Sequence, residues 1–191
     1  MHCVAGSLPV AELTANPAPL PPGVALRAVT AADRPFLLRL FRAVRWDELA
    51  PTGWPEPAKI DFLDNQFDLQ QRHYGLAFVG ADFSVIECDG VPIGRFSVDR
   101  TTARLHLIEI SLIPEWRGRG VGAGLIGQLQ EAVLAGEAAG VVLNVERTNV
   151  GAERLYRRLG FVESPPTAPY PGLSIEMVWP PSATAAVSQV S

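Results

Sequence analysis

The stretch Leu112-Ile113-Pro114-Glu115-Trp116-Arg117-Gly118-Arg119-Gly120-Val121-Gly122 decides how this chain is interpreted. Three of its glycines fall within five residues, between a strand-like segment, 104–112, and a helix-like one. Glycine lets the backbone turn tightly and lets a ligand approach N–H groups without a Cβ in the way. A helix start adds unpaired donors and the positive end of the dipole. The stretch therefore predicts an anion-binding turn, usually for phosphate, although a plain strand-to-helix connection would also explain it.

The stretch does not match the motifs of other phosphate-binding loops. It lacks the Gly-Lys-Ser/Thr of a P-loop and the G-x-G-x-x-G of a dinucleotide fold. What remains is Arg-x-x-Gly-x-Gly after a strand that ends Leu-x-Pro. Further along, the chain reads Asn149-Val150-Gly151-Ala152-Glu153-Arg154-Leu155-Tyr156-Arg157-Arg158-Leu159-Gly160-Phe161.

Both motifs resemble signatures of the GCN5-related N-acetyltransferase (GNAT) superfamily. The first resembles its pyrophosphate loop, and the second matches N-x-x-A-x-x-L-Y-x-x-x-G-F at every defined position. The motifs occur in the right order, separated by one predicted helix and one predicted strand. The resemblance covers about residues 24–179 and is weaker before Val91.

The resemblance implies an α/β fold, with a single mixed, mostly antiparallel sheet of about seven strands flanked by about four helices. Residue periodicity and turn residues agree with it. They predict strands at 24–29, 83–88, 91–99, 104–112, 141–145, 161–163 and 174–179, and helices at 30–42, 58–74, 121–140 and 151–159. Residues 46–57, rich in Pro and Gly, are expected to be a loop.

The chain is expected to hold one domain at 23–180. Four prolines between Ala15 and Gly23 preclude a helix, so 1–22 is predicted to be a Pro-rich flexible tail. Residues 181–191 are predicted to be a flexible tail as well.

By the same resemblance, acetyl-CoA is the acetyl donor and the protein transfers the acetyl group directly to a primary amine. The Leu112 backbone would bond the pantetheine arm and polarise the thioester carbonyl, and Asn149 would bond the arm or cap a helix. The N–H groups of 117–122 would hold the pyrophosphate. The expected cofactor-binding residues are Leu112, Ile113, Arg117, Gly118, Arg119, Gly120, Val121, Gly122, Asn149 and Tyr156. No metal is expected.

Tyr156 occupies the position of the general acid in the family. A phenol near the sulfur could protonate the departing thiolate, a step typically worth about 10²–10⁴ in rate. The alternative is simple packing on an amphipathic helix.

His106 and Glu109 are equal candidates for the general base. Strand alternation places His106 on the face of Leu112, whereas a β-bulge would favour Glu109 instead. A chain of water molecules is the third possibility.

Two other classes of function stay open beside the acetyltransferase. One is a non-catalytic acyl-CoA-binding or sensing module, and the other is an unrelated phosphate- or nucleotide-binding α/β protein. The acceptor amine is expected at the first two helices and the loop at 45–54, where two acids and two tryptophans could hold a cationic or aromatic amine. Packing of these tryptophans into the core is the alternative.

The composition of the chain indicates which classes of partner and which cell compartment to expect. The chain has 191 residues, a formal net charge of −4 and a sequence pI near 5.4, which argues against nucleic-acid binding. Cys3 and Cys88 are too few for a disulfide framework or a zinc site. No apolar run reaches the length of a membrane helix, and the amino terminus does not resemble a signal peptide. We expect a cytoplasmic protein without a membrane partner. Because GNAT proteins are often dimers, the resemblance adds a homodimer to the expected partners.

Overall fold

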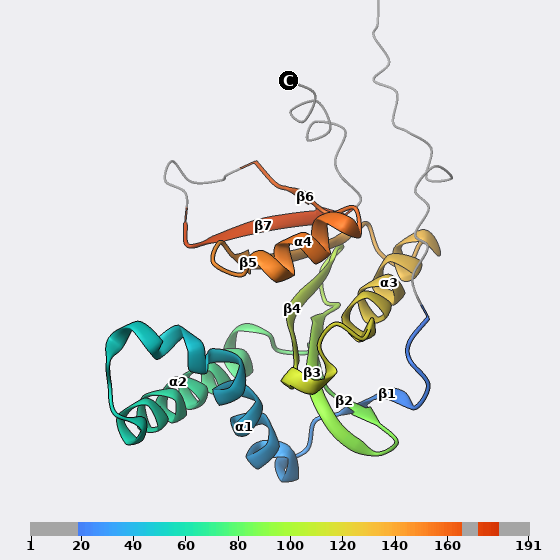
Figure 1. Cartoon of the computed structure of the whole chain (residues 1–191). Coiled ribbons are helices and arrows are strands. Elements are labelled where there is room, and N and C mark those ends of the chain that lie inside the picture. Colours follow the sequence, from blue (N-terminus) through green and yellow to red (C-terminus); the bar gives the residue numbers. More distant parts are fainter. Residues whose placement is uncertain (1–18, 166–171, 180–191) are drawn as a thin grey trace, which may run out of the picture. The chain divides into compact units, whose positions relative to one another are not determined.

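The computed structural model describes residues 19–165 and 172–179 (Figure 1). Seven strands are hydrogen-bonded in the order β1-β2-β3-β4-β5-β7-β6. β4 and β5 are parallel, whereas the pairs β1/β2, β2/β3, β5/β7 and β6/β7 are antiparallel. Together with four α-helices in the described residues, this confirms the predicted mixed, mostly antiparallel α/β fold.

The chain divides into two compact units. The amino unit comprises Leu20–Thr101 and Ile108–Gly122, and the carboxyl unit comprises Thr102–Leu107 and the chain from Ala123 onward. β4 (Leu105–Leu112) contributes its first three residues to the carboxyl unit and its last five to the amino unit. Most of the predicted tails, 1–18 and 181–191, lie outside the described residues.

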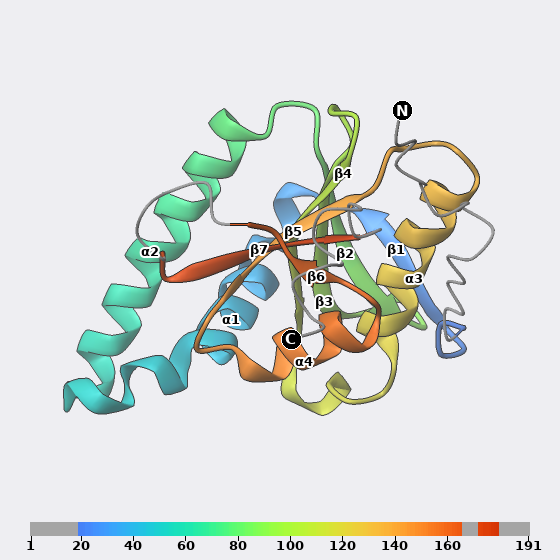
Figure 2. The same ribbon diagram turned by 90° about the horizontal axis from the view of Figure 1, so that it is seen from above.

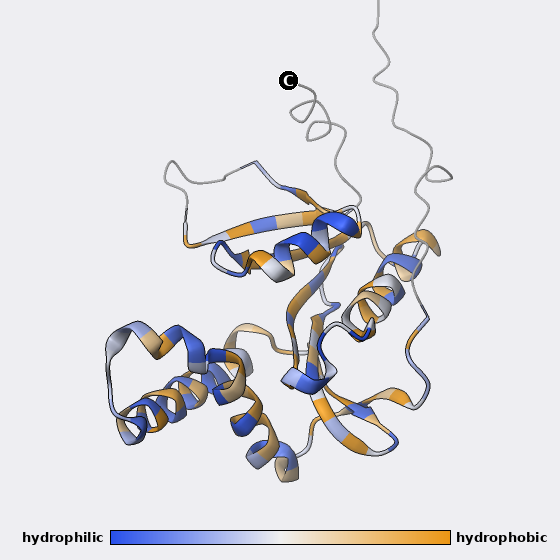
Figure 3. Cartoon of the chain, viewed as in Figure 1, coloured by the Kyte–Doolittle hydropathy of each residue, from blue (hydrophilic) through white to orange (hydrophobic). Residues whose placement is uncertain are grey.

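The amino unit is built on the antiparallel strands β1 (Val24–Ala28), β2 (Asp82–Cys88) and β3 (Val91–Asp99). Asp89 and Gly90 connect β2 to β3, and both have positive φ, 50° and 79°. These are the backbone angles of a two-residue hairpin turn that matches strand twist, so the predicted hairpin is confirmed. Figure 3 shows hydrophilic and hydrophobic residues alternating along this hairpin.

The helices α1 (Arg34–Arg45) and α2 (Glu56–Ala77) of this unit pack against each other, and α2 is seen at full length in Figure 2. Leu37 and Phe41 of α1 form a buried cluster with Leu63 and Phe67 of α2. The rings of Phe41 and Phe67 meet edge to face, with their centroids 5.6 Å apart.

The prediction of a loop at 46–57 is wrong for its first part, because Trp46–Thr52 forms a 3₁₀ helix, η3. Trp46 and Leu49 pack against the cluster between α1 and α2. Residues three apart share a face of a 3₁₀ helix, so this winding directs both side chains inward. The expected packing of a tryptophan therefore holds for Trp46, whereas Trp54 is 43% exposed.

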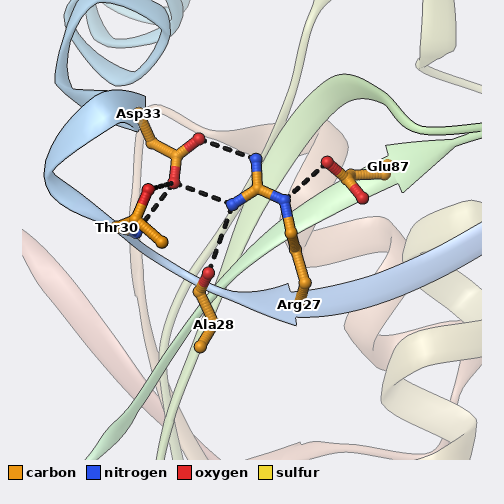
Figure 4. Close-up of polar contacts among 5 residues, drawn as sticks. All are labelled: Arg27, Ala28, Thr30, Asp33 and Glu87. Atoms are coloured by element: carbon orange, nitrogen blue, oxygen red, sulfur yellow. Dashed lines mark hydrogen bonds and ion pairs between the residues drawn. The ribbon is translucent and has the colours of Figure 1, made fainter.

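A polar network fixes the start of α1 to the sheet (Figure 4). The Arg27 guanidinium on β1 donates two hydrogen bonds to Asp33, of 2.7 and 2.8 Å, and one of 2.6 Å to Glu87 on β2. Asp33 also accepts from the N–H and hydroxyl of Thr30. The hydrogen bonds from Arg27 hold the pKa of Asp33 well below its usual range, because they stabilise the charged carboxylate.

The carboxyl unit contains the strands β5 (Val141–Glu146), β6 (Val162–Glu163) and β7 (Ser174–Trp179) with most of α3 (Val121–Leu134) and all of α4 (Val150–Arg158). Val141, Leu143 and Val145 are buried while Asn144 and Glu146 are exposed. β5 is a strand as predicted, but it is fully buried on one face only, whereas its apolar run predicts a strand buried on both.

α3 ends at Leu134 instead of near Gly140. Gly136 has a φ of 81°, the N–H of Glu137 donates to Ala132 O, and the N–H of Gly136 donates to Val133 O. This pair of bonds is a Schellman motif, which ends a helix at a left-handed glycine.

None of the helices in the described residues has the length and hydrophobicity that spanning a membrane requires.

Candidate active site

The glycine-rich turn at 114–120 leads from β4 to α3. A short 3₁₀ turn, η4 (Pro114–Trp116), follows β4, and within it the N–H of Trp116 donates to Ile113 O while that of Arg117 donates to Pro114 O. Gly118 and Gly120 have φ values of 72° and 84°. No heavy atom lies within 4 Å of the position that a Cβ would take at either glycine. The space over the turn is therefore open to an approaching ligand.

Two arginines carry positive charge at this turn. Arg117 folds back toward β4, and its Nε donates a hydrogen bond of 3.0 Å to Leu112 O. The Arg119 guanidinium lies 5.0 Å from the ring centroid of Trp116, a cation–π distance. With the donors at the start of α3, these charges make the turn suitable for a diphosphate.

The end of β4 lies unusually close to β3. A Cβ built on Gly94 would lie 2.4 Å from Ser111 O and 2.8 Å from Leu112 Cδ2. The N–H of Ile113 donates to Ile93 O at 2.9 Å. Glycine at position 94 thus lets the backbone at Ser111 and Leu112, the predicted contact of the thioester arm, sit against β3.

Glu109 is half-buried in the amino unit, on the part of β4 that precedes this backbone. Its Oε1 accepts a 2.9 Å hydrogen bond from the Ser111 hydroxyl. Its Oε2 lies 3.4 Å from Arg95 Nη1, and the Arg95 side chain is only 5% exposed. Tyr74 on α2 lies near the Glu109 carboxylate, whose negative charge adds to burial in raising the pKa of Tyr74.

His106 is half-buried and lies in register with Val142, where β4 pairs with β5. It belongs to the carboxyl unit, together with Asn149 and Tyr156, whereas Glu109, Leu112, Ile113 and 117–122 belong to the amino unit. Each unit thus holds one of the two candidate bases.

Asn149 caps α4. Its side-chain oxygen accepts a 3.1 Å hydrogen bond from the N–H of Ala152, which is the helix-capping role considered for it from the sequence. Its role toward a pantetheine arm stays a prediction.

Tyr156 lies on α4 and is 7% exposed, with its ring centroid 6.0 Å from that of Phe161. Burial raises the pKa of Tyr156 to about 12. α4 ends at Gly160, which has a φ of 84°, and the amide of Gln130 on α3 donates a 2.8 Å hydrogen bond to Leu159 O. The position of Tyr156 is therefore fixed by packing and by the anchored end of its helix.

Sequence reasoning missed Arg95 and Tyr74. The signal for Arg95 was present, because it is a charged residue inside the otherwise uncharged run Val91–Val98 of a strand with a buried face. A buried arginine needs a carboxylate partner, and Glu109 on the adjacent predicted strand was available. Tyr74 carried no comparable signal.

The sequence profile of the Acetyltransferase (GNAT) family matches residues 41–161, which is more than half of the chain. The chain belongs to the GNAT acetyltransferase family. The matched range contains both motifs and every candidate site residue.

Two curated relatives support the assignment. The chain is 31% identical over 78 residues to N-alpha-acetyltransferase MAK3 of Arabidopsis thaliana, an alignment that covers 41% of each protein. It is 37% identical over 90 residues to the uncharacterized N-acetyltransferase MJ1207 of Methanocaldococcus jannaschii, covering 42% of this chain and 39% of the relative. The alignments thus span about two fifths of the length of each relative.

Solved structures share the fold. PaiA N-acetyltransferase of Thermoplasma acidophilum, crystallised with coenzyme A, aligns over 81% of this chain and 97% of its own, with a TM-score of 0.59 and 17% identity. A spermidine N-acetyltransferase SpeG chimera from Vibrio cholerae aligns over 82% of this chain and 94% of its own, with a TM-score of 0.55 and 20% identity. Residues 19–165 and 172–179 contain no group of three or more His, Cys, Asp or Glu side chains that could hold a metal ion.

Proposed function

We propose that this protein is an acetyl-CoA-dependent N-acetyltransferase that acts on a primary amine. The observation that carries the proposal is the open turn at 117–122, where Gly118 and Gly120 leave room for a diphosphate between two arginines. A Cβ at either glycine would fill the space over the backbone donors. Membership of the GNAT family supports the same ligand.

Acetyl-CoA would supply an acetyl group activated as a thioester. The donors at the start of α3, with Arg117 and Arg119, would hold its diphosphate. The backbone of Leu112 and Ile113 and the side chain of Asn149 would position its arm. The net change is an ammonium and a thioester giving an amide, a thiol and one proton: a C–N bond forms and a C–S bond breaks.

We propose Glu109 as the general base. Arg95 holds Oε2 in a buried ion pair, while Oε1 accepts a hydrogen bond from the Ser111 hydroxyl and keeps a second lone pair for a proton of the incoming ammonium. His106 is the alternative. Glu109→Gln and His106→Ala are expected to separate the two, because only the loss of the base lowers kcat while leaving acetyl-CoA binding unchanged.

We propose Tyr156 as the general acid. A pKa of about 12 keeps its hydroxyl protonated at neutral pH, as a proton donor must be. Once the thiolate takes that proton, the phenolate would recover one from solvent.

The experiment measures thiol release from acetyl-CoA with a panel of amines. The panel contains spermidine, short peptides with a free amino terminus, and an amino-terminally blocked peptide with one lysine. The MAK3 relative supports the peptide amino terminus as an acceptor class, and the SpeG structure supports polyamines. Transfer to any of them confirms the reaction and identifies the class.

A thermal-shift comparison of acetyl-CoA with ATP and NAD tests the ligand separately, since a ligand stabilises only the state that binds it. Stabilisation by acetyl-CoA without transfer to any amine would favour the acyl-CoA-binding module. Stabilisation by ATP or NAD alone would favour an unrelated nucleotide-binding protein.

We also propose a cytoplasmic location and a possible homodimer. The proposed location rests on the sequence, which has only two cysteines, Cys3 and Cys88. Cell fractionation and sedimentation of the purified protein test the two statements.

A further inference from the structure

Arg95 is a buried charge at the centre of the amino unit. Its guanidinium carbon lies 5.2 Å from the ring centroid of Tyr74 and 5.6 Å from that of Phe83. These two rings are stacked, with centroids 5.9 Å apart and an interplanar angle of 21°. Arg95 Nη2 also donates a 3.4 Å hydrogen bond to Gln71 Oε1. The contacts hold the guanidinium in one place between α2, β2 and β3.

The ion pair between Arg95 and Glu109 is incompletely hydrogen-bonded. Arg95 Nε and Glu109 Oε2 are both buried and have no hydrogen-bond partner, and the buried Ser97 Oγ has none either. Nη1 and Oε2 lie 3.4 Å apart, so the two charges attract each other, but the two atoms form no hydrogen bond. The ion pair thus orients Oε2 inside the unit, while Oε1, which accepts from the Ser111 hydroxyl, keeps a lone pair that can accept a proton.

Stability does not explain such a pair. Desolvation of two charges usually offsets their attraction, and well-packed apolar residues in their place are often as stable or more so. The pair does fix the orientation of Glu109, which Ser111 alone would leave free to rotate.

We propose that Arg95 is a positioning residue for Glu109. It holds Oε2 in a buried ion pair, so that Oε1 is the oxygen left to take a proton from the acceptor, and Tyr74 adds a contact from α2. This inference rests on the proposed acetyltransferase function and on Glu109 as the base. It places the general base in the amino unit.

The contacts of Tyr74 support this role. Burial, and next the negative charge of Glu109, raise the pKa of Tyr74. Its hydroxyl therefore keeps its proton at neutral pH, as a donor beside the carboxylate must.

A double-mutant cycle on kcat tests the proposal. Arg95→Gln is expected to lower kcat roughly ten- to hundredfold, the range for a misplaced catalytic group, and to leave KM for acetyl-CoA within about twofold. In a Glu109→Gln background the same change should alter kcat less than about twofold, because there is no base left to position. A merely structural role would lower kcat by the same factor in both backgrounds, and that result would overturn the proposal.

The control variant is Arg100→Gln, which removes the Arg100–Asp82 pair just beyond β3, where both side chains are largely exposed. It should keep the wild-type kcat. Arg95→Lys, which keeps the charge without the planar fork, should recover part of the lost kcat, and it carries the test if Arg95→Gln does not fold. A wild-type kcat in Arg95→Lys and Arg95→Gln would contradict the role.

Different results would refute the proposed function and the proposed role of Arg95. If the wild-type protein transfers acetyl to no amine of the panel, the proposed function fails. If it transfers acetyl and the cycle shows no coupling between Arg95 and Glu109, only the role of Arg95 fails.

Discussion

Replacing Gly94 by alanine tests whether the approach of β3 to the end of β4 serves the reaction. The new Cβ would lie 2.4 Å from Ser111 O, and real Cβ contacts essentially never fall below 3.0 Å, so the two strands must separate by at least 0.6 Å. The neighbouring atom is backbone, which cannot rotate away. Leu112 Cδ2 at 2.8 Å and Ile86 Cδ1 at 3.1 Å leave little room on the other sides.

The magnitude follows from that displacement. Overpacking of this kind typically costs about 1–3 kcal/mol of unfolding free energy. For a chain of this size that corresponds to roughly 2–4 °C in Tm per kcal/mol. Because the displaced backbone is the proposed contact of the thioester carbonyl, kcat should fall as well, by up to about 10² for a shift near 1 Å.

The assay measures Tm and the kinetics of acetyl transfer, with Gly75→Ala as the matched control. Gly75 lies on α2, where an added Cβ meets nothing within 4 Å, so alanine should stabilise the helix by about 0.5–1 kcal/mol and leave kcat unchanged. If Gly94→Ala keeps the wild-type Tm and kcat, the end of β4 does not need this close approach and the reasoning is refuted.

Three further substitutions test other parts of the account. Tyr156→Phe should lower kcat about 10²–10⁴-fold and barely change KM for acetyl-CoA; unchanged turnover would remove Tyr156 from the mechanism. Asp33→Asn should lower Tm by a few degrees at pH 7. Arg27 lowers the pKa of Asp33 in the folded protein, so the charged carboxylate stabilises the fold fully at pH values above its unfolded pKa near 4. This stabilisation is lost as the pH falls below that value, so the Tm values of wild type and variant should converge in acid. A difference in Tm that stays constant down to pH 2 would contradict this. Gln130→Leu leaves Leu159 O without its buried donor and should cost about 1–3 kcal/mol by denaturant unfolding, whereas Gln128→Leu on the exposed side of α3 should cost little.

The order of the elements could be predicted from the sequence because each has a local signal. The Asp89-Gly90 turn, the glycine turn before α3 and the apolar run of β5 depend on residues adjacent in the chain. The end of α3 was placed too late because Gly136 and Gly140 offer equivalent stops, and only the hydrogen bonds at Gly136 distinguish them. η3 was missed because Pro51 and Gly53 suggest a loop, while the packing of Trp46 and Leu49 onto α1 and α2 depends on tertiary structure.

In the candidate site too, local motifs predict some of the residues, and tertiary contacts place the others. The turn at 117–122 and Tyr156 follow from motifs, so the sequence predicts them directly. Arg95 carries a local signal, as a lone charge in the run Val91–Val98, whereas Tyr74 carries none. Their approach to Glu109 joins β3 and α2 to β4, and no local pattern reveals that. The choice between Glu109 and His106 likewise depended on side-chain partners that strand alternation does not supply.

Calorimetric titration of the purified protein with acetyl-CoA tests whether the turn at 117–122 binds the cofactor. We expect a saturable 1:1 isotherm that weakens strongly in Gly120→Val, whose side chain would fill the open space over the turn and strain a backbone at a φ of 84°. Absence of any heat with the wild-type protein, or an unchanged isotherm in Gly120→Val, would contradict this expectation.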